Sequence, residues 1–145
     1  MKKVVIGCDH AAFELKDLVV AHLQKQGYEV DDQGCHGPDS VDYPDYAQKV
    51  ARVVLDQQIP GILICGTGIG ISIAANKIKG IRAALCHTEF EAQMCRNHND
   101  ANVLCMGARV IGQGQALALV DRYLDSDFEG GRHQRRVDKM MGLEG

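Results

Sequence analysis

The sequence has 145 residues, of which 46% are hydrophobic and 24% are charged, and its net charge is −3. This length predicts one domain, spanning residues 1–145, with a single well-packed core. Because there is no excess of basic residues, nucleic-acid binding has no electrostatic support. There is also no run of about 18 apolar residues and no signal-peptide pattern, so we expect a cytoplasmic protein without a membrane partner.

Short apolar runs alternate with amphipathic segments along the chain. In chain order, we expect a strand at 3–8, a helix at 12–27, a strand at 28–34, a loop at 35–44, a helix at 46–58, a strand at 61–66, a helix at 71–78, a strand at 81–86, a helix at 88–98, a strand at 102–107, a helix at 114–126 and a helical start after the glycines at 130–131. The strands are interpreted as apolar on both faces, which is typical of a buried parallel sheet. The pattern predicts an α/β protein: a three-layer α/β/α Rossmann-like fold with a five-stranded parallel sheet.

Binding sites in such folds gather at the carboxyl ends of the strands, and one end is rich in glycine. The segment "CGTGIG" (65–70) has glycine at every second position. A dinucleotide fingerprint would need glycine where Ile71 stands, and a P-loop would need Gly-Lys, so nucleotide binding is disfavoured. Three glycines with Thr67 predict instead a nest of backbone N–H groups at a helix N-terminus. Such a nest stabilises a phosphate or a charge that develops during a reaction.

Cys65 stands beside this nest, at a place where a thiolate is favoured. Buried cysteine is commonly an inert small hydrophobe, so position alone leaves open whether Cys65 is catalytic. The chain has six cysteines, and we expect free thiols because nothing indicates a secreted protein. Cysteine and histidine also lie close together at 8–10, 35–36, 86–87 and 95–98. None of these groups has the spacing of a structural zinc site, so no metal site is expected.

Seven sequence blocks, spread from one end of the chain to the other, resemble the ribose-5-phosphate isomerase B family. They are "GCDHAAFELK" (7–16), "DYP" (42–44), "ICGTGIGISIAANK" (64–77), "GIRAA" (80–84), "RNHNDANVL" (96–104), "GARV" (107–110) and "FEGGRHQRRV" (128–137). The resemblance implies an aldose–ketose isomerase that interconverts ribose 5-phosphate and ribulose 5-phosphate through an enediolate, without a cofactor or metal. It also implies the strand order 2-1-3-5-4.

The resemblance implies a role for each matched residue. Cys65 is the base that takes the C2 proton, although some relatives carry glutamate there, and His98 opens the sugar ring. Thr67 belongs to the catalytic loop, whose backbone N–H groups would bind the enediolate oxygens. The loop residues are Gly66, Thr67, Gly68, Ile69 and Gly70, and the remaining substrate contacts are Asp9, His10, Tyr43, Asn99, Arg109, Arg132 and Arg136. The three arginines match phosphate-binding positions.

The residues alone also allow plainer interpretations of these positions. His98 fits a helix C-terminal cap, Asp9 a helix N-cap, Tyr43 a packed aromatic beside a proline, and "RHQRR" (132–136) a solvated basic tail. Arg132 and Arg136 are four residues apart, so a helix would place both on one face. No role is assigned to His133 or Arg135.

The family resemblance also implies a homodimer, able to pair into tetramers, with active sites at the subunit interface. Two other functions stay open. One is isomerisation of a six-carbon 6-phosphate sugar, allose or galactose 6-phosphate; the galactose 6-phosphate relatives lack the "HND" (98–100) and "GGRHQRR" (130–136) segments present here. The other is a non-catalytic sugar-phosphate sensor, which would not need both Cys65 and His98.

Overall fold

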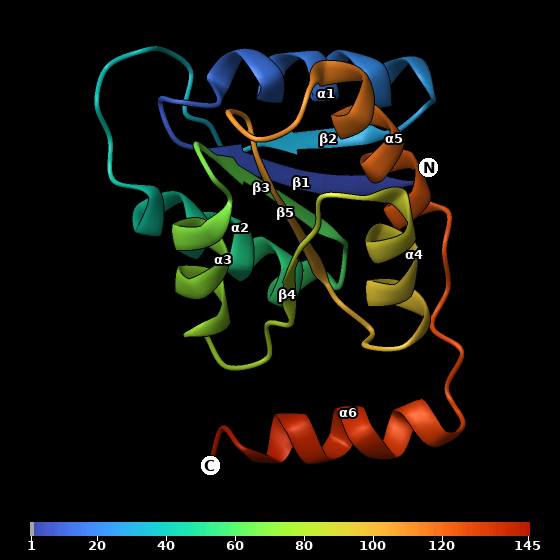
Figure 1. Cartoon of the computed structure of the whole chain (residues 1–145). Coiled ribbons are helices and arrows are strands. Elements are labelled where there is room, and N and C mark those ends of the chain that lie inside the picture. Colours follow the sequence, from blue (N-terminus) through green and yellow to red (C-terminus); the bar gives the residue numbers. More distant parts are fainter. Residues whose placement is uncertain (1) are drawn as a thin grey trace.

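The computed structural model describes residues 2–145 and contains a five-stranded sheet (Figure 1). Its strands are β1 (Lys3–Cys8), β2 (Glu29–Asp32), β3 (Gly61–Cys65), β4 (Ala83–Leu85) and β5 (Val103–Gly107). All neighbouring pairs are parallel, and the order across the sheet is β2-β1-β3-β5-β4. The predicted fold class and strand order are therefore confirmed.

Helices cover both faces of the sheet. The helices are α1 (Phe13–Lys25), α2 (Tyr43–Gln57), α3 (Ile69–Asn76), α4 (Glu89–Asn97), α5 (Gln113–Leu124) and α6 (Arg132–Gly142). Side chains alternate along the central strands: Ile62 and Ile64 of β3 face the core under α1, α4 and α5, whereas Leu63 and Cys65 face the core under α2 and α3. The two-residue period of a strand thus divides the apolar residues between two layers.

Three local features differ from the sequence prediction. The edge strands β2 and β4 are only partly buried, so the expectation that every strand is covered on both faces is wrong for them. Helix α2 begins at Tyr43 rather than at residue 46, because Pro44 has a backbone angle that suits the first helical turn. Helix α3 begins at Ile69 rather than at residue 71, so part of the glycine loop is already helical.

Helix α6 lies apart from the two layers, at the lower end of the molecule in Figure 1. Only His133 and Val137 of this helix are buried. Its C-terminal end is attached to the body by the backbone N–H of Gly80, which donates to a Glu144 carboxylate oxygen at 2.9 Å. Within residues 2–145, no helix combines the length and the apolar character needed to cross a membrane.

Candidate active site

The turn from β3 into α3 brings the backbone unusually close to strand β5. Gly68 has φ of 79°, and a Cβ there would lie 2.7 Å from the carbonyl carbon of Met106. A Cβ on Gly107 would lie 2.5 Å from the carbonyl carbon and oxygen of Thr67. Both positions therefore need glycine, one for its positive φ and both for the close contact. This packing fixes the loop at the carboxyl end of the sheet.

The thiol of Cys65 faces the first turn of α3. Its Sγ accepts a hydrogen bond from the backbone N–H of Gly68 at 3.1 Å, and the residue is 4% exposed. All six cysteines are free thiols. Burial raises the pKa of Cys8 and of Cys105, so these two thiols stay protonated. Cys65 lies at the end of its strand, with the backbone N–H of Gly68 directed at its sulfur.

Polar residues that follow neighbouring strands lie at the same carboxyl end of the sheet. Asp9 follows β1, is 7% exposed, and accepts a hydrogen bond from the N–H of Ala11 at 3.0 Å on one carboxylate oxygen. It caps this turn, while the N-cap of α1 is Ala12, so the interpretation of Asp9 as a helix N-cap is wrong. The Nδ1 atom of His10 accepts from the N–H of Val41 at 3.1 Å, which leaves Nε2 to carry the proton of the neutral ring.

Arg109 and Tyr43 border the glycine loop. The N–H of Arg109 donates to the carbonyl oxygen of Gly66 at 2.9 Å, and its guanidinium is 3.3 Å from where a Cβ on Gly66 would lie. The ring of Tyr43 packs on Gly70, where a Cβ would come within 2.6 Å of the ring. These two predicted site residues are therefore brought to the loop around Cys65.

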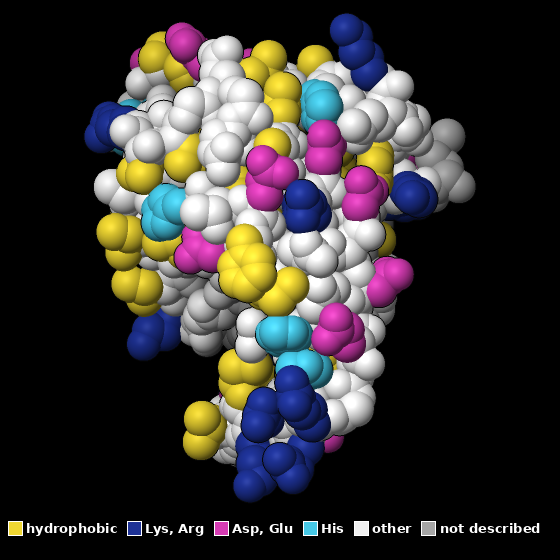
Figure 2. All heavy atoms as spheres, turned by 45° about the vertical axis from the view of Figure 1, so that its right-hand side comes forward, with side chains coloured by type: hydrophobic (Ala, Val, Ile, Leu, Met, Phe, Trp, Pro, Cys, Tyr) yellow, Lys and Arg dark blue, Asp and Glu magenta, His cyan; other side chains and the backbone are white. Residues whose placement is uncertain are grey.

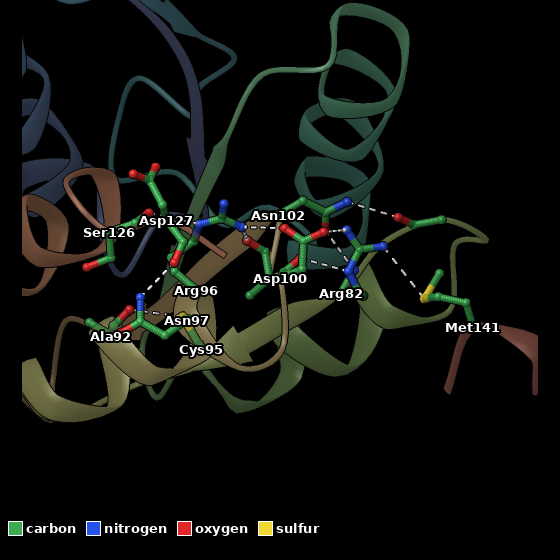
Figure 3. A network of polar contacts seen from close by, with 12 residues as sticks. Arg82, Ala92, Cys95, Arg96, Asn97, Asp100, Asn102, Ser126, Asp127 and Met141 are labelled. Atoms are coloured by element: carbon green, nitrogen blue, oxygen red, sulfur yellow. Dashed lines mark hydrogen bonds and ion pairs between the residues drawn. The ribbon is translucent and has the colours of Figure 1, made fainter. Parts of the chain in front are cut away.

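A second group of predicted site residues lies at the other end of the sheet, where the strands begin. His98 is the C-terminal cap of α4, and Asp100 after it has φ of 48°. The Asp100 carboxylate pairs with Arg96 at 2.9 Å and with Arg82 at 3.4 Å, which holds this turn against the body (Figure 3). The amide of Asn97 donates to the carbonyl oxygen of Asp127 at 2.7 Å and links the turn to the segment that leads into α6.

His98 is stacked on His133 of α6. Their ring centroids are 4.2 Å apart and the ring planes differ by 11°. A Glu129 carboxylate oxygen lies 3.7 Å from Nε2 of His98 and 3.6 Å from Nε2 of His133. The two histidines border a cavity of about 360 Å³ that is also lined by Asn99, Arg136, Val137 and Met140. Figure 2 shows two adjacent histidine side chains beside a dense group of Lys and Arg side chains.

The two histidines and Glu129 have the residue types of a zinc site, but their arrangement does not suit one. The lone pair of an imidazole nitrogen lies in the plane of its ring. Because these two ring planes are stacked and nearly parallel, one ion cannot lie in both planes. We therefore do not interpret this group as a zinc site.

The structure thus gathers the predicted site residues into two groups instead of one. Cys65, the loop 66–70, Arg109 and Tyr43 lie around the carboxyl end of β3. His98, Asn99 and Arg136 lie where α4 ends, and α4 runs back from the carboxyl end of β4 toward the beginning of β5. In Figure 1 the two groups lie at opposite ends of the strands.

Sequence reasoning missed His133 and Glu129, which it left without a role. They are far from His98 along the chain and meet it only because the segment after α5 returns to the end of α4, where the N–H of Glu129 donates to the carbonyl oxygen of Asn97 at 3.0 Å. A signal was present, since His133 and Val137 are four residues apart and form the one buried stripe of α6.

Comparison with known proteins finds close relatives over the whole chain. A family model described as Ribose/Galactose Isomerase matches residues 4–140. Ribose-5-phosphate isomerase B of Escherichia coli is 51% identical over 145 residues, which cover 99% of this chain and 97% of the relative. The solved structure of Clostridium thermocellum ribose-5-phosphate isomerase B is 52% identical, with a TM-score of 0.96 over 98% of this chain and 97% of that one. The Mycoplasma genitalium enzyme, solved with bound ribulose-5-phosphate, is 43% identical, with a TM-score of 0.95 over 98% of this chain and 95% of that one.

Proposed function

This chain belongs to the ribose/galactose isomerase family and is an isomerase, and we propose that it interconverts ribose 5-phosphate and ribulose 5-phosphate with Cys65 as the base. The observation that carries the assignment of the base is the hydrogen bond from the N–H of Gly68 to Sγ of Cys65 at 3.1 Å. A sulfur held this way at a helix N-terminus can act as a thiolate, and a thiolate can remove a proton from carbon.

The proposed reaction moves protons without a cofactor. In the cyclic aldose, the hydroxyl on C1 loses its proton and the ring oxygen gains one from His98, which opens the ring. The thiolate of Cys65 then takes the proton from C2, and the electron pair left behind forms the C1–C2 double bond of an enediolate. Backbone N–H groups of residues 66–70 hold the negative oxygen on C1. The hydroxyl on C2 then gives its proton to this oxygen, and Cys65 returns its proton to C1, which leaves the C2 carbonyl of the ketose.

The phosphate end of the substrate requires cations to bind it. Arg132 and Arg136 are exposed on one face of α6, and Arg136 lines the same cavity as His98. A guanidinium fork can form paired hydrogen bonds with phosphate oxygens. We assign these two residues, together with Arg109 at the carboxyl end of the sheet, to the phosphate of the substrate.

We also propose that the working unit is a homodimer with two shared sites. Within one chain, Cys65 lies at the carboxyl end of the sheet and His98 at the end where the strands begin. A site that uses both residues therefore needs a second copy of the chain. Helix α3 offers an apolar surface next to Cys65, with Ile69 53% exposed and Ile73 56% exposed one turn later. Burying such a surface stabilises association, and twofold symmetry makes two equal sites.

The test is turnover by the purified protein with ribose 5-phosphate, followed by allose 6-phosphate and galactose 6-phosphate at the same concentrations. We expect the pentose phosphate to have the highest kcat/KM and the rate to be unchanged in EDTA. A higher kcat/KM for a six-carbon sugar would change the substrate assignment. Loss of turnover in EDTA that a divalent ion restores would contradict the metal-free mechanism, and binding without turnover would indicate a sensor.

A further inference from the structure

His98 has two neighbours that the reaction described above does not use. Glu129 is attached to the end of α4 by its backbone N–H, which donates to the carbonyl oxygen of Asn97 at 3.0 Å. His133, in the first turn of α6, presents the face of its ring to the ring of His98 at a centroid distance of 4.2 Å. Three segments of the chain therefore meet at the ring of His98.

Protonating one of the two imidazoles makes protonation of the other unfavourable. Two imidazolium rings 4.2 Å apart would repel each other, whereas the carboxylate of Glu129 favours a single positive charge beside it. His98 is the better place for that charge, because its side chain is 41% exposed and that of His133 is 11% exposed.

The other charged groups that face His133 act in the same direction. Burial lowers the pKa of His133, and the positive charges of His98, Arg132 and Arg136 lower it further, while Glu129 opposes this. His133 therefore stays neutral near pH 7, and its ring offers a flat, uncharged surface.

We propose that His133 is a positioning residue for His98: the stacked ring of His133 fixes the plane of the His98 ring and, being neutral, leaves the one extra proton of the pair to His98, while Glu129 stabilises the positive charge of the pair. This inference rests on the proposed function, because it gives His98 the proton that the ring oxygen of the sugar receives. The step is balanced, since the proton lost by His98 is regained from the C1 hydroxyl through solvent.

The positioning role predicts a loss that is confined to ring opening. A misplacement of a catalytic group by 1 Å can cost about 10²-fold in rate. Substituting leucine for His133 removes the flat surface, so we expect kcat for ribose 5-phosphate to fall by about 10²-fold with KM little changed. Ribulose 5-phosphate has no ring to open, so exchange of its C1 proton with solvent deuterium should stay close to the wild-type rate.

Two matched variants separate orientation from packing. His133→Phe keeps a flat ring on His98 and should retain kcat within about tenfold of wild type. Val137→Ala loosens the same buried stripe of α6 one turn later but leaves the ring of His133 in place on His98. The proposal is overturned if His133→Leu keeps the wild-type kcat, if it slows turnover and C1 exchange equally, or if Val137→Ala lowers kcat as much.

A titration of the histidine rings by NMR tests the proton assignment without substrate. In the wild type, His133 should titrate below its ordinary value of about 6.5, and His98→Asn should move that titration to higher pH because a neighbouring positive charge is lost. Titration of His133 at or above 6.5 would refute the proposal. If the wild type neither isomerises nor exchanges C1 protons, the proposed function fails, and this titration still decides whether His133 is the neutral member of the pair.

Discussion

The proposed role of Cys65 rests on a local contact that distinguishes it from Cys105. Cys105 lies on the neighbouring strand β5 and is buried among apolar groups, which raises its pKa. Cys65 is nearly as buried, at 4% exposed, but it ends its strand and receives a backbone N–H. A reactive cysteine differs from an inert one by such local stabilisation of the thiolate.

We expect Cys65→Ser to lower kcat for ribose 5-phosphate by at least about 10²-fold, because a serine hydroxyl is a far weaker base and general base catalysis contributes about 10²–10⁴-fold. Cys86→Ala is the control, since Cys86 directly follows strand β4 and is assigned no chemistry. Iodoacetamide should inactivate the wild type, and substrate should slow this inactivation. Near-normal turnover by Cys65→Ser would mean that another residue is the base.

Arg136→Ala should mainly raise KM for ribose 5-phosphate, by about ten- to a hundredfold, because a hydrogen bond to a charged group contributes about 1.5–3 kcal/mol. Competition by inorganic phosphate should weaken in parallel. Arg135→Ala is the matched control, an exposed neighbour with no assigned contact. The phosphate assignment is wrong if kcat/KM for unphosphorylated ribose falls by the same factor as that for ribose 5-phosphate.

At the scale of elements, the site depends on how tightly the β3–α3 turn packs on β5. There is no room for a side chain at Gly68 of the turn or at Gly107 of β5, and the shape of the turn directs the backbone N–H of Gly68 toward the sulfur of Cys65. Helix α1 is held on the opposite face by a buried cation: Lys16 is fully buried and its Nζ lies 2.7 Å from a carboxylate oxygen of Asp32 at the end of β2.

Gly68→Ala should destabilise the fold by at least about 1–2 kcal/mol, the usual cost of a left-handed conformation, and should also lower kcat because the loop must shift. Gly112→Ala is the control, because Gly112 has φ of −77° and open space around it. Urea unfolding at one fixed protein concentration measures the difference. Equal stability of the two variants would show that the loop tolerates a side chain.

Lys16→Met should lower the free energy of unfolding by about 3 kcal/mol, since removing one partner of a buried ion pair leaves the other charge uncompensated. Lys3→Met removes an ion pair to Glu29 at 3.7 Å whose side chains are about half exposed, and should change stability by less than about 1 kcal/mol. Similar losses in both variants would contradict this account of Lys16.

The sequence allowed most elements to be predicted, because buried parallel strands and amphipathic helices have distinct periodicities. It failed where tertiary context decides: the strand at 28–34 was predicted to be buried on both faces, but β2 is only partly buried because it lies at the sheet edge and pairs with β1 alone. The loop around Cys65 was predicted because its residues are contiguous. The His98–Glu129–His133 group was not, because only folding brings these three residues together.

For the whole molecule, the proposed chemistry needs side chains from both ends of the strands. One chain places Cys65 and its glycine loop at the carboxyl end of the sheet, and His98 and Arg136 at the opposite end. In a twofold dimer, each site can take the thiol from one subunit and the imidazole from its partner, so the two sites are equivalent. The proposed function therefore requires that each site be shared between two subunits.

Mixing two inactive variants shows whether each site is shared between two subunits. Cys65→Ser and His98→Asn are unfolded together in equal amounts, refolded and assayed with ribose 5-phosphate, with each variant refolded alone as the control. Half of randomly formed dimers are mixed and each mixed dimer has one intact site of two, so a shared site predicts recovery of about one quarter of the wild-type activity. Activity no higher than the mean of the two controls, with mixed dimers present, would show that each site lies within a single chain and would contradict the account.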